Sequence, residues 1–106
     1  MKLSEPYYTL VKQKKKIIEI RINDEKRKLL KIGDKIKFTK TNGNNHFILK
    51  IKDLKTSHNF ENAIKQTTLK KCMPNIKNIK EAVEIYRSFP YYKDKEKYYG
   101  IILIYL

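Results

Sequence analysis

The final stretch of the chain constrains the fold more than any other. Gly100 opens a run of six apolar residues, from Ile101 to Leu106. A strand that is apolar on both faces is typical of the centre of a sheet, where other elements cover both of its faces. The run is also much too short to span a bilayer. The sequence therefore predicts that this segment is a buried central strand.

A second strand is predicted near the N-terminus, at 17–22. Isoleucines at every second position from 18 to 22 alternate with Glu19 and Arg21, which is the period of a half-buried strand. With the isoleucines facing a core, Glu19 and Arg21 project from the opposite face, about 6.6–7 Å apart along the strand. The lysines at 14–16 add positive charge directly before it. Two interpretations stay open: a small ionic site, or an exposed ion pair worth about 0–1 kcal/mol.

Two further strands are predicted as a hairpin. Segments 35–40 and 46–54 alternate in polarity on either side of 41–45, whose Asn and Gly residues suit a hairpin loop. The apolar residues within 29–32 are expected to enter the core just before this hairpin. Both strands carry lysines on their outward faces, which is typical of solvated surface and sometimes of a phosphate-binding wall. These lysines are Lys35, Lys37, Lys50 and Lys52.

Helices are predicted between and after the strands. Ser4 is a suitable N-cap for a short first helix, and Asn59 for a second helix. Asn78 is followed three residues later by a glutamate, as in a capping box, and opens a third helix that Pro90 ends. Residues 91–99 are rich in tyrosine and charge and are predicted as a loop. This order of elements predicts an α+β fold, in which a small β-barrel closed by the final strand would bury that strand best.

Composition and charge limit the function classes. With 106 residues, 41% of them apolar and 34% charged, the chain is expected to form one globular domain over 1–106. Its formal net charge of +14 indicates an acidic partner, and we favour nucleic acid over a membrane surface. Part of the lysine excess is equally consistent with an AT-rich coding sequence. Lysine cannot replace the planar, bidentate guanidinium group, and the chain has only three arginines, Arg21, Arg27 and Arg87.

The cysteine and histidine content argues against a disulfide and against zinc. Cys72 is the only cysteine, which excludes a disulfide within the chain and fits a reducing compartment. Together with only two histidines, His46 and His58, it cannot complete a tetrahedral zinc site. We therefore expect no metal and no cofactor. The N-terminus also lacks the apolar segment of a signal peptide, so we expect a soluble, cytoplasmic protein without membrane association.

Several stretches in order along the chain resemble a known family. Lys16, Glu19 and Arg21 stand at the spacing Lys-x-x-Glu-x-Arg, with Lys14 two residues earlier. This resembles the signature Gly-x-Lys-x-x-Glu-x-Arg of the ASCH domain family, which is related to PUA domains, with Lys14 in place of the glycine. The resemblance implies a small PUA-like β-barrel with flanking helices. The other similar stretches are Asn23–Arg27, Lys31–Asp34, Glu81–Arg87 and Tyr98–Gly100.

The resemblance also implies a function. ASCH domains are regarded as modules that bind RNA, with the signature lining a cleft beside the barrel. Some members are small enzymes that hydrolyse N4-acetylcytidine, using a Lys at the position of Lys16, a Thr at the position of Glu19 and a later Glu. In this chain Glu19 replaces that hydroxyl. The nearest candidates for the later acid are Glu61, Glu81 and Glu84.

A hydrolase acting on RNA or on a modified nucleoside, amidohydrolase-like or ribonuclease-like, is therefore the alternative function. Glu19 would act as a general base toward water, and Lys16 and Arg21 would stabilise a developing oxyanion or a phosphoryl group. The competing interpretation is that Glu19 and Arg21 pair only to hold the shape of the cleft. A third possibility, a small basic adaptor that binds protein, would need an apolar surface patch.

RNA or nucleotide binding uses more of the sequence than hydrolysis does. Lysines would contact phosphates, and arginines would make bidentate contacts. Tyrosines late in the chain would stack on unpaired bases, which is worth about 1–3 kcal/mol per base. Tyr86 lies on the apolar stripe of its helix and is expected to pack in the core. The predicted RNA contacts are Lys14, Lys15, Lys16, Arg21, Arg27, Tyr91, Tyr92 and Tyr98.

Overall fold

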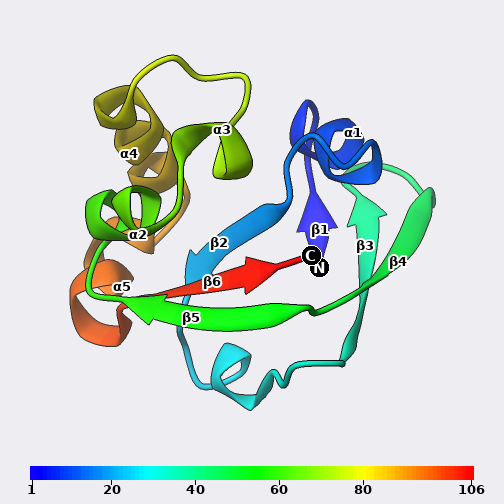
Figure 1. Cartoon of the computed structure of the whole chain (residues 1–106), viewed down its shortest axis with the longest axis horizontal. Coiled ribbons are helices and arrows are strands. Elements are labelled where there is room, and N and C mark those ends of the chain that lie inside the picture. The colour runs from blue at the N-terminus through cyan, green and yellow to red at the C-terminus, as the bar shows by residue number, and fades with distance from the viewer.

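The strands form two three-stranded sheets in the computed structural model, which describes residues 1–106 (Figure 1). One sheet has the order β1-β3-β4 and the other the order β2-β6-β5. The elements are β1 (Lys2–Leu3), α1 (Tyr7–Lys12), β2 (Ile18–Ile22), the 3-10 helix η1 (Arg27–Leu29), β3 (Lys35–Lys40), β4 (His46–Lys50), β5 (Asp53–Ser57), α2 (Phe60–Gln66), α3 (Leu69–Cys72), α4 (Ile79–Ser88), α5 (Tyr92–Tyr99) and β6 (Ile101–Tyr105).

Strand β6 is the central strand of its sheet, as the sequence predicts. It pairs antiparallel with β2 on one side and with β5 on the other. Its side chains alternate between two hydrophobic cores: Ile101 and Leu103 belong to the larger core, whereas Ile102 and Ile104 belong to the smaller one. The apolar character of both faces of β6 is therefore explained by a separate core on each side.

The larger core lies between the β2-β6-β5 sheet and the helices α2, α3 and α4, which stand together on one side of the molecule in Figure 1. The isoleucines of β2 face this core, as predicted from their alternation. The smaller core lies between the same sheet and the β1-β3-β4 sheet, and it includes residues of α1. Its buried members are Leu3, Tyr8, Val11, Ile36, Phe38, Ile51, Ile102 and Ile104.

The predicted β-barrel is not confirmed, although the α+β class is. The return strand predicted at 46–54 is divided in two: β4 pairs with β3, and β5 pairs with β6 in the other sheet. Ile51 lies buried at the break between them, where its backbone bonds to Asp34 rather than to a neighbouring strand. The chain thus passes from one sheet to the other at this point, and no single closed ring of strands forms.

The two asparagine caps are confirmed. The Asn59 side chain accepts a hydrogen bond from the backbone of Asn62 at the start of α2, and the Asn78 side chain accepts one from Glu81 at the start of α4. The predicted Ser4 cap is wrong, because α1 begins at Tyr7 and has no side-chain cap.

Two other predictions from the local pattern are wrong. Leu29 and Ile32 remain 75% and 63% exposed instead of entering the core, whereas Leu30 packs against the smaller core as predicted. Residues predicted as a loop form helix α5. Helix α5 has a polar sequence, but its Glu96 is buried and accepts hydrogen bonds from Arg87 and from the backbone of Phe60. Tertiary contacts of this kind outweigh local propensity. No helix in the structure has the length and apolar character needed to cross a membrane.

Candidate functional site

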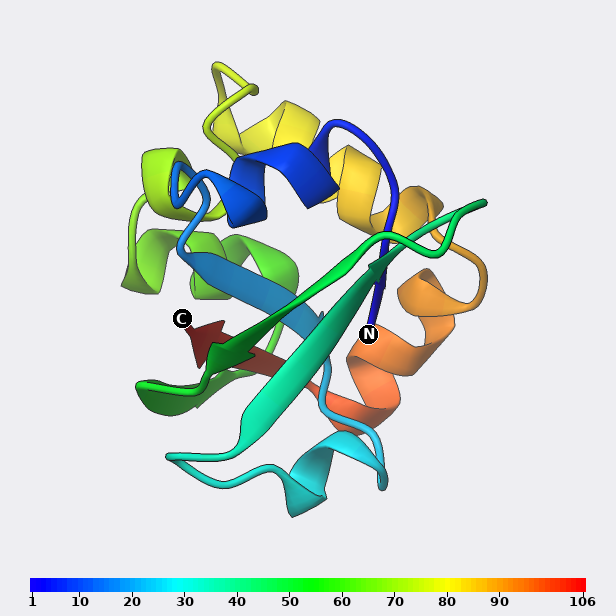
Figure 2. The same cartoon turned by 90° about the vertical axis from the view of Figure 1, so that its right-hand side faces the viewer.

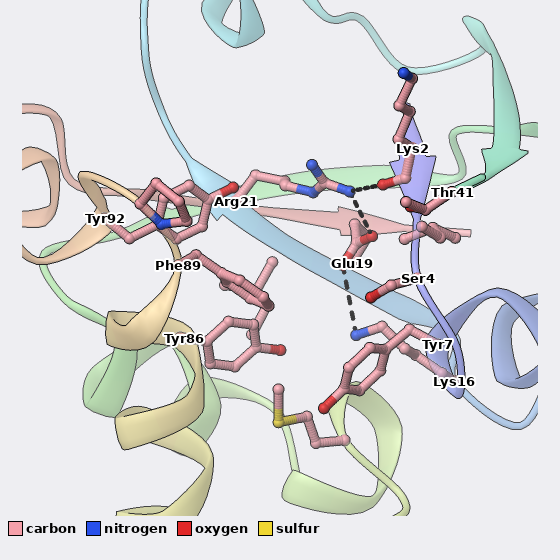
Figure 3. Close-up of a pocket in the computed structure, with 14 residues that line it drawn as sticks. Lys2, Ser4, Tyr7, Lys16, Glu19, Arg21, Thr41, Tyr86, Phe89 and Tyr92 are labelled. Carbon is pink, nitrogen blue, oxygen red and sulfur yellow. Dashed lines mark hydrogen bonds and ion pairs between the residues drawn. The ribbon is translucent and has the colours of Figure 1, made fainter.

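A pocket of about 280 Å³ lies where β1, β2, α1 and the segment joining α4 to α5 meet (Figure 3). It is close to the size expected of a site for one small ligand. Half of the lining is hydrophobic, and the polar lining includes the three signature residues Lys16, Glu19 and Arg21. Its remaining lining residues are Lys2, Leu3, Ser4, Tyr7, Ile20, Thr41, Met73, Tyr86, Phe89, Pro90 and Tyr92.

The turn before β2 directs Lys16 into this pocket. Lys14 adopts a left-handed backbone with φ of 61°, which only glycine adopts without strain. The N–H groups of Lys15 and Lys16 then both bond to the carbonyl oxygen of Leu10. The chain reverses here, so Lys14 and Lys15 stay exposed while Lys16 is only 2% exposed.

The ammonium group of Lys16 is fully surrounded by acceptors. It donates to the carbonyl oxygen of Ile18 at 3.0 Å and to that of Cys72, and it lies 3.5 Å from a Glu19 carboxylate oxygen. It also lies 5.9 Å from the centre of the Tyr7 ring, within range of a cation–π contact. Two of the three ammonium protons are donated to these carbonyl oxygens, which leaves one for the ion pair with Glu19. Lys16 is therefore placed to orient Glu19.

Glu19 lies buried between two cations. One carboxylate oxygen faces Lys16, and the other accepts a hydrogen bond from Arg21 Nη2 at 3.2 Å. Burial alone would raise the pKa of Glu19, but the positive charges of Arg21 and Lys16 outweigh it and hold the pKa below its usual value. Glu19 is therefore ionised at neutral pH, and its remaining lone pairs can accept hydrogen bonds from a ligand.

Arg21 connects Glu19 to strand β1. Its Nη2 also donates to the backbone oxygen of Lys2 at 3.0 Å. Burial would lower the pKa of Arg21, but the Glu19 carboxylate raises it overall, so the guanidinium stays charged. Its side chain is partly exposed, on the side of the pocket where Lys2 and Tyr92 lie (Figure 3).

Tyr86 contributes a polar group without a partner. Its ring stacks on Phe60 with the centroids 4.9 Å apart, yet its buried hydroxyl has no hydrogen-bond partner and points into the pocket (Figure 3). Burial raises the pKa of Tyr86 well above its ordinary value, so the hydroxyl keeps its proton. A buried polar group normally has a partner, and a ligand in this pocket could supply it.

The structure brings together only part of the predicted site. Lys16, Glu19, Arg21 and Tyr92 line the pocket, but the other predicted contacts do not. Arg27 is paired with Asp24 at 2.8 Å. Tyr91 and Tyr98 are 74% and 81% exposed, and Tyr98 lines a separate polar groove with His58 and Lys97.

Sequence reasoning missed several lining residues. Tyr86 was expected to be a core residue, and it is one, but its buried hydroxyl points toward the pocket (Figure 3). The hydroxyls of Ser4 and Thr41 and the ring of Phe89 also line it. No sequence signal marks these residues, because they come from segments that meet only in the folded chain. The structure has no group of three His, Cys, Asp or Glu side chains placed to hold a metal ion.

Comparisons with known proteins agree with this architecture. The family model described as ASCH domain matches residues 1–106. The crystal structure of the hypothetical protein PH0355 is similar, with a TM-score of 0.86 and 34% identity over 99% of this chain and 93% of that one. The solution NMR structure of protein PF0455 from Pyrococcus furiosus has a TM-score of 0.74 and 31% identity over 99% and 94% of the two chains. No curated protein matches the chain.

The signature of the matched family is also found in the residues beside the pocket. Lys16, Glu19 and Arg21 occupy the signature positions and lie within one connected ionic cluster. The left-handed residue Lys14 stands where the signature has glycine, the residue that suits this backbone best. The chain therefore belongs to the ASCH domain family, which is generally linked to RNA binding.

Proposed function

We propose that this protein binds RNA by taking one unpaired nucleotide into the pocket beside Lys16, Glu19 and Arg21. The observation that carries the proposal is the unpartnered hydroxyl of Tyr86, which faces the same pocket as the ionised Glu19 and the charged Arg21. Unsatisfied or spare hydrogen-bonding capacity at these three residues would match the donors and acceptors on the edge of a base.

The lining favours a base rather than a phosphate in the interior. The anionic Glu19 would repel a phosphate but can accept hydrogen bonds from a base N–H group. The partly exposed rings of Tyr7, Phe89 and Tyr92 offer surfaces for a planar heterocycle. Phosphates would then lie at the mouth, near the partly exposed Arg21.

The exposed predicted contacts remain proposals outside the pocket. Lys14 and Lys15 lie on the turn before β2, and Tyr91 stands next to the pocket residue Tyr92 in the chain. In these positions the lysines would contact phosphates and Tyr91 would stack on a neighbouring base. Arg27 and Tyr98 lie outside the pocket lining, so we propose them only as contacts of a longer strand.

A hydrolytic role is less well supported by the geometry. Lys16 would have to give up one of its three acceptors before it could stabilise an oxyanion. Glu19 has a lowered pKa, which makes it a weak base. Nucleotide binding requires neither a free Lys16 ammonium group nor a strongly basic Glu19.

The test is a titration of each of the four ribonucleoside 5′-monophosphates, followed by two-dimensional NMR. At least one nucleotide should shift the amide signals of β2 and of the segment between α4 and α5. Arg21→Gln should weaken that binding about 10–100-fold, as expected for loss of a hydrogen bond to a charged group. Binding of no nucleotide, together with unchanged RNA affinity in Arg21→Gln, would refute the proposal.

Tyr86→Phe provides a second variant with a matched control. It should weaken nucleotide binding about 2–10-fold, the effect of one neutral hydrogen bond. Tyr8 also has a buried hydroxyl without a partner, but it lies in the smaller core and outside the pocket. Tyr8→Phe should therefore leave binding unchanged. Equal effects of the two substitutions would remove the role given to the Tyr86 hydroxyl.

A further inference from the structure

The outer face of the β1-β3-β4 sheet carries a cluster of lysines. Because Ile36 and Phe38 are buried on the inner face, the alternating residues of β3 point outward. The strand register places Lys50 of β4 directly opposite Lys35, and Lys2 of β1 beside Thr39. Strands β3 and β4 cross the front of the molecule in Figure 2, with no helix in front of them. We call the exposed residues Lys2, Lys35, Lys37 and Lys50 the lysine face.

No anionic side chain neutralises the lysine face. None of its four lysines forms an ion pair, in contrast to Lys40, which pairs with Glu5, and Lys65, which pairs with Glu61. The other outward residues of β3 and β4 are Thr39, His46 and Ile48, none of which is acidic. Like charges directly opposite each other on neighbouring strands, as in the Lys35–Lys50 pair, are destabilising. A bound polyanion would relieve this repulsion.

The lysine face is continuous with the pocket through Lys2. Lys2 lines the pocket, and its backbone oxygen accepts the hydrogen bond from Arg21. Its side chain belongs to the outer face of the sheet. Lys2 pairs with Thr39 of β3. Lys35 lies four residues before Thr39 on the same strand, so the lysine face is about 13 Å long. This length accommodates several phosphates of an extended single strand.

We infer that the lysine face is the path of the RNA backbone once one nucleotide has entered the pocket. The strand leaves the pocket at Lys2 and crosses β3 and β4, with its phosphates on Lys37, Lys35 and Lys50. The inference rests on the proposed function, because the pocket fixes one nucleotide and thereby the start of the path. It differs from attraction to a general positive charge, because removing charge from the lysine face would weaken RNA binding more than removing the same charge from α3 and α4.

The test compares two triple variants with the same change in net charge. Lys35→Gln/Lys37→Gln/Lys50→Gln removes most of the lysine face. Lys70→Gln/Lys77→Gln/Lys80→Gln removes three exposed lysines without an ion pair from the region of α3 and α4, on the other side of the molecule (Figure 1). Fluorescence anisotropy gives the affinity of each protein for a labelled 12-nucleotide RNA of randomised sequence, at several NaCl concentrations.

The slope of log affinity against log salt reports the number of phosphates neutralised, at about 0.7 for each phosphate of a single strand. Loss of three contacts should make the slope about 2 units shallower in the lysine-face variant. A rise from 50 to 200 mM salt would then weaken binding about 20-fold less than in the unchanged protein. The control variant should change the slope by less than about 0.5. Thermal unfolding of both variants checks that the fold is retained.

Two results would overturn the inference. Equal changes of slope in the two variants would mean that the lysines act as diffuse charge, and an unchanged slope in the lysine-face variant would mean that phosphates lie elsewhere. Either result leaves the pocket proposal standing if mononucleotides still bind and Arg21→Gln still weakens their binding. Failure of the mononucleotide test is therefore distinguishable from failure of the backbone path.

Discussion

Two buried glutamates in this protein are held by cations, but only Glu19 lines the candidate pocket. Glu19 on β2 lies between Lys16 and Arg21. Glu96 on α5 accepts two hydrogen bonds from Arg87, at 2.8 and 3.2 Å, and a third from the backbone of Phe60 at 2.8 Å. Glu19 and Glu96 are 4% and 6% exposed.

The difference lies in what each carboxylate holds together. Glu96 links the start of α2 to α4 and α5, so its partners explain its burial as a structural connection. Glu19 has only side-chain cations as partners, and the pocket beside it contains the unpartnered Tyr86 hydroxyl. Burial and ion pairing alone therefore do not distinguish a site from a structural connection. Polar groups without a hydrogen-bond partner beside the buried carboxylate do distinguish the two.

Neutralising the two glutamates tests this comparison most strongly. Glu19→Gln should lower the free energy of unfolding by about 3–5 kcal/mol, because it leaves the fully buried Lys16 ammonium without its counterion. Glu96→Gln should cost about 1–3 kcal/mol, because Arg87 is 42% exposed at its side chain and can be hydrated instead. Urea denaturation monitored by circular dichroism measures both values.

The order of the two effects is the informative result. A larger loss in Glu96→Gln than in Glu19→Gln would show that the cluster beside the pocket is the more tolerant one, and that Lys16 finds other compensation. Asp94→Asn, on the same helix as Glu96 but exposed and without an ion pair, is the control and should lower stability by less than about 1 kcal/mol, the effect of its charge in the first turn of α5.

Acid titration sharpens the comparison through the pKa of Glu19. Because the folded state lowers this pKa, ionised Glu19 contributes stability that is present above its unfolded pKa and is lost as pH falls through the folded pKa. Each unit of difference between the two pKa values corresponds to about 1.4 kcal/mol. Stability measured from pH 6 to pH 2 should therefore fall more steeply in the unchanged protein than in Glu19→Gln. Parallel curves would contradict the lowered pKa.

Much of the fold could be predicted from local patterns. The alternating isoleucines of β2, the apolar β6 and the asparagine caps of α2 and α4 each depend on residues close together in the sequence. The barrel prediction is not confirmed because nothing in the polarity of 46–54 shows that pairing changes from β3 to β6 at Ile51. Helix α5 was missed because a distant contact, the one between Glu96 and α2, holds it in place.

The candidate site could be predicted only where one segment forms it. The spacing of Lys16, Glu19 and Arg21 placed three side chains together because they lie in one turn and strand. Tyr86, Phe89 and Thr41 reach the pocket from segments distant in sequence. Three successive lysines also look alike in sequence, and only the backbone at Lys14 decides which one is buried.

The smallest expected effect concerns the turn at Lys14, which places Lys16 beside Glu19. A non-glycine residue in the left-handed region costs about 1–2 kcal/mol, whereas glycine adopts it freely but gains more entropy on unfolding. Lys14→Gly should therefore raise the free energy of unfolding by about 0.5–1 kcal/mol. Lys15 does not have a positive φ, so Lys15→Gly should be neutral or destabilising. A loss of stability in Lys14→Gly would mean that the Lys14 side chain contributes more than its backbone strain costs, and that the turn does not limit the stability of the Glu19 cluster.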